Sequence, residues 1–339
     1  MNGRDRILRS VRACVPDCLP CMPITMMFAS DFAGSRYIDY ATDHRIQSGA
    51  QLDLADRFDL DHVSVISDSG VEAVDCGADV TFFENAPAAF KEEVSLLRDK
   101  AVLSNLSMPD PRRGGRMSNQ VAAVEDLAVG VGHKRLIEGW VEGPCAESAN
   151  LRGINRLMRD FYDDPLFVRE LVNFVVELEI SFGRAQIDAG AEVIGIGDAA
   201  ASLIGPALYS EFIWPGERCI IAAMHDAGAI CRLHICGNNL PVLASAAKLG
   251  CEIIDVDGPI VSMRDARRAV GTAQVLCGNL DPVRSIHDGT PESIRAELTD
   301  CHIQAGPRYI VAAGCEIPRG TPFDNFAAMV DFARATAGE

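Results

Sequence analysis

The sequence predicts an α/β protein folded as a (β/α)8 TIM barrel, and three observations support this prediction. Short apolar segments alternate with helical patterns along the 339 residues, and Gly or polar residues follow the apolar segments. This alternation is typical of parallel β/α units, and eight such units close into a barrel. No Pro/Gly/Ser-rich or charged linker divides the chain, so we expect one domain over residues 1–339, with residues 1–22 as an N-terminal helical extension.

Eight segments are the expected strands, because each is short and apolar and ends at polar residues or Gly. In chain order they are residues 23–29, 62–67, 135–141, 192–197, 229–235, 252–257, 273–279 and 308–313. Helical patterns cover residues 4–13, 43–58, 89–98 and 206–227, and residues 77–84 resemble a hairpin. Between the third and fourth strands, an apolar stripe at spacings of three and four predicts a long core helix; it consists of Phe167, Leu171, Phe174, Val175, Leu178 and Phe182.

Composition excludes several classes of partner. The formal net charge is −17, from 31 Lys and Arg against 48 Asp and Glu, which argues against a nucleic-acid backbone or an anionic membrane surface. No apolar run is long enough to span a bilayer and no leader pattern opens the sequence, so we expect a cytoplasmic protein. Twelve cysteines in such a setting favour free thiols or metal ligands over disulfides.

A candidate metal site begins in the sequence Arg-Leu-His-Ile-Cys-Gly-Asn at residues 232–238. Alternate side chains of a strand share a face, so His234 and Cys236 point the same way. Cys315, which follows another expected strand, is the best third ligand, and one His with two Cys suits zinc with an open position. The alternative is that these are ordinary buried core residues. Their place at strand ends, where barrel enzymes carry their chemistry, favours the metal site.

Polar residues end the other expected strands, on the same rim of the barrel. The candidates for substrate binding are Asp68, Glu142, Asp198, Asn238, Asp257 and Asn279. Each could instead cap a helix or satisfy a buried amide. A fourth zinc ligand could be Asp257, Glu316 or water, and the sequence does not choose among them.

Two further motifs have two readings each. The basic, Gly-rich loop at residues 109–116 could bind an anionic substrate, although its composition favours a solvated loop. The spacing of Cys14, Cys18 and Cys21 fits a radical S-adenosylmethionine iron–sulfur cluster. Interruption by prolines, and a place before the first expected strand rather than after it, argue against such a cluster.

The ligand set itself favours one reaction class. Two thiolates and a neutral imidazole cancel the double charge of zinc, whereas hydrolytic zinc sites favour neutral His ligands or a carboxylate mixture. A thiolate-rich zinc suits the binding of another thiol, which coordination deprotonates while leaving its sulfur electron-rich. The predicted reaction is therefore alkyl transfer to sulfur.

Five segments resemble the uroporphyrinogen decarboxylase-like superfamily of barrels over nearly the whole chain. They are residues 66–68, 142–144, Asp198 with Ser202, Gly-Asn-Leu-Asp-Pro at 278–282, and residues 314–325. Decarboxylases of that superfamily carry Arg-Gln-Ala-Gly-Arg after the first strand, where this chain has Ser-Asp-Phe-Ala-Gly-Ser at residues 30–35. They also have His at the position of Cys315.

The chain is more similar to the methylcobalamin:coenzyme M methyltransferase branch, which has a His-x-Cys…Cys zinc site. This resemblance implies that His234, Cys236 and Cys315 bind Zn²⁺ and act in catalysis. It further implies that a zinc-bound thiol takes the methyl group of methylcobalamin or another corrinoid. The Asp-x-His-x-x-Gly corrinoid signature is broken at Ala305, so the corrinoid is expected on a separate corrinoid protein.

Several alternatives remain open at this point. The acceptor could be a coenzyme M-like thiol or tetrahydrofolate, and a homodimer is compatible with the sequence. The protein could also be a methyltransferase that loads a corrinoid protein from a methylated donor. A uroporphyrinogen decarboxylase-type lyase and a non-catalytic metal- or corrinoid-binding subunit are the more distant readings.

Overall fold

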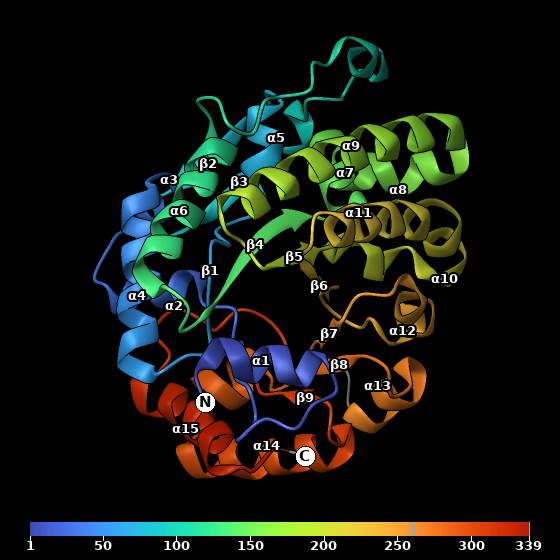
Figure 1. Ribbon diagram of the computed structural model, residues 1–339. Coiled ribbons are helices and arrows are strands. Elements are labelled where there is room, and N and C mark those ends of the chain that lie inside the picture. Colours follow the sequence, from blue (N-terminus) through green and yellow to red (C-terminus); the bar gives the residue numbers. More distant parts are fainter. Residues whose placement is uncertain (259–261, 339) are drawn as a thin grey trace.

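A curled sheet of parallel strands with helices on its outside forms the described part of the chain, as Figure 1 shows for the computed structural model. The structure describes residues 1–258 and 262–338. In spatial order the sheet consists of β1 (His62–Ser64), β4 (Leu136–Glu142), β5 (Val193–Gly197), β6 (Ile230–His234), β7 (Ile253–Val256), β8 (Val275–Gly278) and β9 (Tyr309–Ile310). Every neighbouring pair is parallel, which confirms the predicted barrel class and seven of its eight expected strands.

The prediction of a first strand at residues 23–29 is wrong. Helix α2 (Met26–Phe32) begins inside this range, and the residues before it lie extended beside β9. The Met22 amide donates to Val311 O at 3.0 Å, and the Val311 amide donates to Pro20 O at 2.8 Å. Pro20 and Pro23 have no amide hydrogen to donate, so this eighth position of the barrel is an extended segment with isolated pairing rather than a regular strand.

Helices surround the sheet. They include α3 (Tyr37–Thr42), α4 (His44–Phe58), α5 (Val71–Asp75), α6 (Arg116–Val131), α7 (Pro144–Arg152), α8 (Ile154–Asp163), α9 (Pro165–Ala189), α10 (Gly205–Leu208), α11 (Trp214–Asp226), α12 (Leu240–Ala246), α13 (Met263–Val270), α14 (Pro291–Ala305) and α15 (Phe323–Ala335). Those predicted at residues 43–58 and 206–227 are confirmed by α4 and by the helical stretch from α10 to α11. The stripe on α9 is buried in the core as expected, with Phe174 partly buried. None of the described helices is both long enough and apolar enough to cross a membrane.

The excursion after β1 is an antiparallel hairpin, as its sequence indicates. It pairs β2 (Val80–Phe83) with β3 (Ala86–Phe90). The predicted helix at residues 89–98 is wrong, because Ala89 and Phe90 pair with Thr81 and Val80 of β2. Only a short 3₁₀ turn, Glu92–Val94, follows. Tertiary pairing here overrides a local pattern that is compatible with a helix.

Helix α1 (Gly3–Val11) closes one end of the barrel. Its Ile7 and Leu8 pack against an inner cluster made by the first residues of four strands, Leu136, Val193, Ile253 and Val275. In Figure 1 this helix lies across the middle of the barrel. Arg6 of this helix is buried and pairs with Asp61. The amino ends of the strands are therefore plugged, which leaves the carboxyl ends as the end of the barrel where a site is expected.

Candidate metal centre

Three side chains from distant parts of the sequence meet at the carboxyl ends of the strands. His234 ends β6, Cys236 lies two residues beyond it, and Cys315 follows β9. His234 Nε2 is 2.9 Å from Cys236 Sγ and 3.7 Å from Cys315 Sγ, and the two sulfurs are 3.8 Å apart. These three atoms thus form one compact group of candidate ligands, all within 4.8 Å of one another.

The group matches the dimensions of a zinc site. Tetrahedral zinc, with bonds of about 2.3 Å to sulfur and about 2.0 Å to nitrogen, places two sulfurs about 3.8 Å apart and sulfur and nitrogen about 3.5 Å apart. The sulfur–sulfur distance of 3.8 Å and the longer nitrogen–sulfur distance of 3.7 Å fit these values. The distance of 2.9 Å between His234 and Cys236 would have to open by roughly 0.6 Å. The residues present therefore fit the metal with only a small adjustment.

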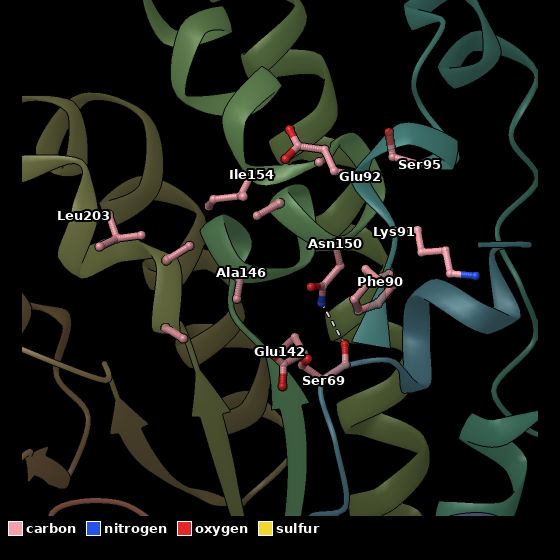
Figure 2. Close-up of a pocket in the computed structure, with 14 residues that line it drawn as sticks. Ser69, Phe90, Lys91, Glu92, Ser95, Glu142, Ala146, Asn150, Ile154 and Leu203 are labelled. Carbon is pink, nitrogen blue, oxygen red and sulfur yellow. Dashed lines mark hydrogen bonds between the residues drawn. The ribbon is translucent and has the colours of Figure 1, made fainter. Parts of the chain in front are cut away.

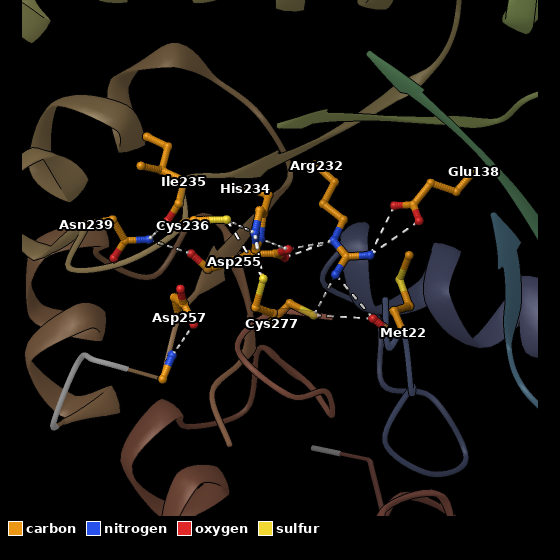
Figure 3. A network of polar contacts seen from close by, with 12 residues as sticks. Met22, Glu138, Arg232, His234, Ile235, Cys236, Asn239, Asp255, Asp257 and Cys277 are labelled. Atoms are coloured by element: carbon orange, nitrogen blue, oxygen red, sulfur yellow. Dashed lines mark hydrogen bonds and ion pairs between the residues drawn. The ribbon is translucent and has the colours of Figure 1, made fainter. Parts of the chain in front are cut away.

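A chain of buried charges holds His234 in place, as Figure 3 shows. The Nδ1 atom of His234 is 2.9 Å from Asp255 Oδ2. Arg232 Nε donates to both oxygens of Asp255, at 2.9 and 3.1 Å, and Arg232 Nη1 donates to Glu138 at 3.1 Å. A carboxylate on one imidazole nitrogen fixes the ring so that the other nitrogen faces the metal. Asp255 is therefore the positioning group that the sequence reasoning missed.

A signal for this network was present in the sequence. Arg232 is two residues before His234 and so shares its strand face, and Asp255 likewise shares a face with Asp257. The contact itself depends on how β6 and β7 pair, with Arg232 opposite Ile253. That register became known only from the structure.

The pKa values of the three candidate ligands follow from the same contacts. Hydrogen bonding from Cys236, reinforced by His234, lowers the pKa of Cys315 to about 4 despite burial. The hydrogen bond to Cys315 and burial raise the pKa of Cys236 above its ordinary value. Burial opposes the charge of His234, but Cys236 and Asp255 raise its pKa well above the usual value. Metal binding must therefore displace protons from Cys236 and His234.

The two carboxylates considered as a fourth ligand are engaged elsewhere. Asp257 accepts hydrogen bonds from the amides of Gly237 at 2.6 Å and Gly258 at 2.5 Å. Glu316 accepts from the Met27 amide at 2.7 Å, and burial raises its pKa to about 8. Neither oxygen belongs to the compact group of ligand atoms. Water or substrate is therefore the expected occupant of a fourth position.

All three candidate ligands line one small pocket, here called the inner pocket, with a volume of 240 Å³. Apolar and small residues form most of its remaining wall, namely Ile24, Met26, Ile66, Pro87, Trp140, Gly197 and Ala199. Asp68, Ser69, Glu142 and Glu316 are its other polar residues. Such a volume suits a small molecule rather than a tetrapyrrole ring.

The structure brings only some of the predicted substrate-binding residues to this pocket. Asp68 and Glu142 line it. Asp257 lies beside the candidate metal ligands, and two backbone amides hold its carboxylate. Asp198 is fully buried and accepts from the Cys145 and Ala146 amides at 3.3 and 2.7 Å, so it caps the start of α7.

Two predicted residues lie elsewhere. Asn238 is exposed and is not among the residues that line the inner pocket, whereas its neighbour Asn239 is buried and donates to Ile235 O and Asp255 O. Asn279 lines a different cavity, where it accepts from the Cys301 thiol at 3.4 Å. Predicting a shared rim from strand ends thus overestimated how many side chains turn inward.

The two secondary motifs are also placed. In the basic loop, Arg112 and Arg113 are exposed and pair with Asp188 and Asp110, as expected for a solvated loop, whereas Arg116 at its end is buried and pairs with Asp68. Cys14 is exposed, whereas Cys18 and Cys21 are buried, and they do not form one of the compact ligand groups found among the described residues.

A larger cavity of 460 Å³, here called the outer cavity, adjoins the inner pocket and is drawn in Figure 2. Ser69, Glu142 and Ala199 line both. Phe90 and Lys91 from the hairpin and Asn150 from α7 form other parts of its wall. Glu142 therefore stands at the junction between the two spaces.

A parallel barrel with a compact metal-type ligand group at its carboxyl ends defines an enzyme-like TIM barrel. The sequence model of the family "Uroporphyrinogen decarboxylase (URO-D)" matches residues 2–336. The chain therefore belongs to the URO-D family, and the resemblance stated from its motifs is confirmed.

Relatives within this family carry two kinds of name. The chain is 29% identical to the "Methylcobamide:CoM methyltransferase MtbA" of Methanosarcina mazei over 78% of this chain and 76% of that protein. It is also 29% identical to a uroporphyrinogen decarboxylase of Xanthomonas axonopodis pv. citri, over 88% of this chain and 86% of that protein. A solved methyltransferase structure from Methanosarcina mazei has the same fold, with a TM-score of 0.90, 22% identity and 98% coverage of both chains. The similarity to the MtbA protein supports the expectation of a methyltransferase, and the solved structure supports the fold.

Proposed function

We propose that the protein is a zinc-dependent corrinoid methyltransferase, which moves a methyl group between a methylated corrinoid on a separate protein and a small thiol. The observation that carries the proposal is the convergence of His234, Cys236 and Cys315 on one pocket, at distances that fit zinc. The names of the methyltransferase relatives support the same reaction class.

The chemistry of the donor set supports a thiol substrate. His234, Cys236 and Cys315 would hold the zinc, which would lower the pKa of a bound thiol and leave its sulfur nucleophilic. Cys236 and Cys315 supply the two negative charges that offset the metal, and Asp255 keeps His234 Nε2 turned toward it. In the transfer, the sulfur–carbon bond forms as the cobalt–carbon bond breaks, the electron pair stays on cobalt as cob(I)alamin, and the thiol proton passes to solvent.

The size of the inner pocket supports a division of the two substrates. At 240 Å³ it accommodates a small thiol, so the corrinoid would remain at the barrel mouth on its own protein. Trp140, whose ring centroid is 6.1 Å from that of His234, and Ile66 line the same pocket and would shield the sulfur of a bound thiol from water. A thiol is preferred to tetrahydrofolate as the acceptor because of this volume and because the names of the methyltransferase relatives contain CoM or a methylated thiol.

A decarboxylase acting on uroporphyrinogen is the second candidate, since relatives with that name align along most of the chain. Its substrate carries carboxylates that need cations. Arg36, the nearest arginine to the replaced motif, is exposed and pairs with Asp39 at 2.6 and 2.7 Å. The charged groups in the inner pocket other than the metal ligands are carboxyls. This lining favours the methyltransferase.

The test is methyl transfer from methylcobalamin to thiols, followed optically with zinc-loaded protein. We expect turnover in the wild type and a loss of at least about 100-fold in Cys315→Ala, because one metal ligand is removed. The matched control is Cys219→Ser, which changes an exposed cysteine outside the pocket and should retain wild-type turnover. If zinc-loaded protein methylates no thiol, the proposal fails, and release of carbon dioxide from uroporphyrinogen would establish the second candidate instead.

A further inference from the structure

We propose that the inner pocket selects its thiol by charge, and that Glu142 makes it prefer a short thiol with an ammonium group to one with a sulfonate or carboxylate. This inference rests on the proposed function, because it names the class of thiol that the site would take. It follows from the placement of Glu142 and the metal ligands on the walls of the same small space.

The charge of the inner pocket comes from carboxyl side chains. Apart from the metal ligands, the ionisable residues that line it are Asp68, Glu142 and Glu316. Arg116 is the cation next to this wall, and its guanidinium is already engaged in hydrogen bonds. It donates to both oxygens of Asp68, at 2.7 and 2.6 Å, and to Ala41 O at 3.1 Å, and it is not among the lining residues. An anionic group inside the pocket would therefore meet carboxyls rather than a guanidinium.

Glu142 differs from Asp68 in having no ionic partner among the described residues. Its side chain is 7% exposed, and it lines both the inner pocket and the outer cavity. Behind it, Glu72, Glu147 and Glu179 are buried carboxyls that likewise form no ion pair within the described chain. One oxygen of Glu147 also lacks a hydrogen-bond partner there, and Glu179 forms a side-chain hydrogen bond with Glu72.

This wall of carboxyls responds differently to the two signs of charge. Burial, together with Glu72 and Asp198, raises the pKa of Glu142 well above its usual value, so the group tends to keep its proton. An ammonium group beside it favours loss of that proton and forms an ion pair with the carboxylate, whereas a buried sulfonate finds no cationic side chain among the other lining residues. The arrangement thus disfavours anions and can pair with a cation.

The size of the inner pocket sharpens this selection for short thiols. A two-carbon thiol with its sulfur at the metal ligands fits entirely within 240 Å³, so its second group lies among these carboxyls. The lysine of the neighbouring space, Lys91, is exposed and belongs to the lining of the outer cavity alone. Only a longer thiol would reach it.

A matched series of thiols tests the proposal. The compounds are 2-aminoethanethiol, 2-mercaptoethanol, 2-mercaptoethanesulfonate and 3-mercaptopropionate, which share two carbons between the sulfur and the second group. Dissociation constants are measured by calorimetry with zinc-loaded protein, and kcat/KM is measured by methylcobalamin demethylation. We expect the ammonium thiol to bind about 10-fold or more tightly than either anion, with the alcohol between them.

Variants assign the selection to Glu142. In Glu142→Gln the ratio of ammonium to sulfonate binding should fall to within about 3-fold, and Glu142→Asp should restore part of it. Glu93→Gln makes the same substitution at an exposed residue outside both linings and should keep the wild-type ratio. The wild-type series decides the preference even if the Glu142 variants fold poorly.

The outcomes separate this inference from the proposed function. If all four thiols bind and are methylated but the sulfonate binds as tightly as the ammonium thiol, the charge selection is wrong and the methyltransferase proposal stands. An equal loss for all four thiols in Glu142→Gln would assign that residue a structural role and contradict the inference. If no thiol binds or is methylated, the proposed function fails, and this inference fails with it.

Discussion

At the scale of single residues, the buried pair of Arg232 and Asp255 determines how the candidate metal ligands are presented. Arg232 is 1% exposed and is shared between Asp255 and Glu138. Charges buried to this degree are tolerated only when they are paired, so the network holds His234 by groups that cannot easily rearrange. The position of one metal ligand is thus fixed from inside the barrel.

Asp255→Asn tests this positioning role. The amide cannot accept as strongly from His234 Nδ1, so we expect zinc to bind about 10- to 100-fold more weakly, as measured by competition with a chromogenic chelator. Asp126→Asn removes a carboxylate from another histidine, His44, at 2.7 Å, and should leave zinc affinity unchanged. Equal zinc affinity in Asp255→Asn and wild type would contradict the role assigned to Asp255.

The buried carboxyls near Glu142 predict a pH dependence of stability. Burial raises the pKa of Glu72 from 4.5 to about 7, so the folded state holds a proton that the unfolded state releases. The resulting stabilisation is complete below pH 4.5 and is lost as the pH rises through 7. Glu72→Gln keeps the oxygen that accepts from the Glu142 amide at 3.1 Å but cannot ionise.

The free energy of unfolding should therefore fall less between pH 5 and pH 8 in Glu72→Gln than in wild type, by up to about 3 kcal/mol. Urea denaturation at both pH values, at matched metal content, measures this difference. Parallel pH profiles for the two proteins would show that Glu72 is not the titrating group.

At the scale of elements, local sequence patterns predicted where most strands form. The two wrong predictions lie where pairing with another segment determines the structure. Seven strands were predictable because each is a short apolar run that ends at Gly or polar residues. The prediction of a strand at residues 23–29 was wrong because the preceding segment occupies that position in the barrel. Pro20 and Pro23 prevent a regular ladder there. The prediction of a helix at residues 89–98 was wrong because the first residues of this range pair with β2.

The candidate site shows the same division. His234, Cys236 and Cys315 could be selected because their types and strand-end positions carry information within each segment. The contact of Asp255 with His234, and the inward or outward direction of Asn238 and Asn279, depend on strand register and loop course. Those are properties of neighbouring segments together, which one segment's pattern does not contain.

Helix α1 makes a prediction at this scale, since it plugs the amino ends of the strands. Ile7 is fully buried in the inner cluster, so Ile7→Ala should lower the free energy of unfolding by about 2 to 4 kcal/mol. The control, Val129→Ala on α6, shortens an 88% exposed side chain and should change the free energy of unfolding by no more than about 0.5 kcal/mol. Chemical denaturation measures both variants. An equally small change in the free energy of unfolding for Ile7→Ala and Val129→Ala would mean that α1 is not part of the barrel core.

At the scale of the whole molecule, the barrel is closed at one end by α1 and carries its polar cavities at the other. Cys315 lies 79 residues beyond Cys236 in sequence, and the closing of the barrel brings their sulfurs to 3.8 Å. The inner pocket and the outer cavity share a wall at Glu142, so a small substrate and a larger partner can approach the same site from one side. This layout is what a transfer between a thiol and a protein-bound corrinoid requires.

X-ray absorption at the zinc edge, recorded before and after adding a thiol, tests the central claim most directly. We predict zinc bound by two sulfurs and one imidazole nitrogen, with a light atom at the fourth position that a third sulfur replaces when thiol is added. Protein that takes up no zinc, or a bound zinc whose sulfur count is unchanged by a thiol that the enzyme methylates, would contradict the account.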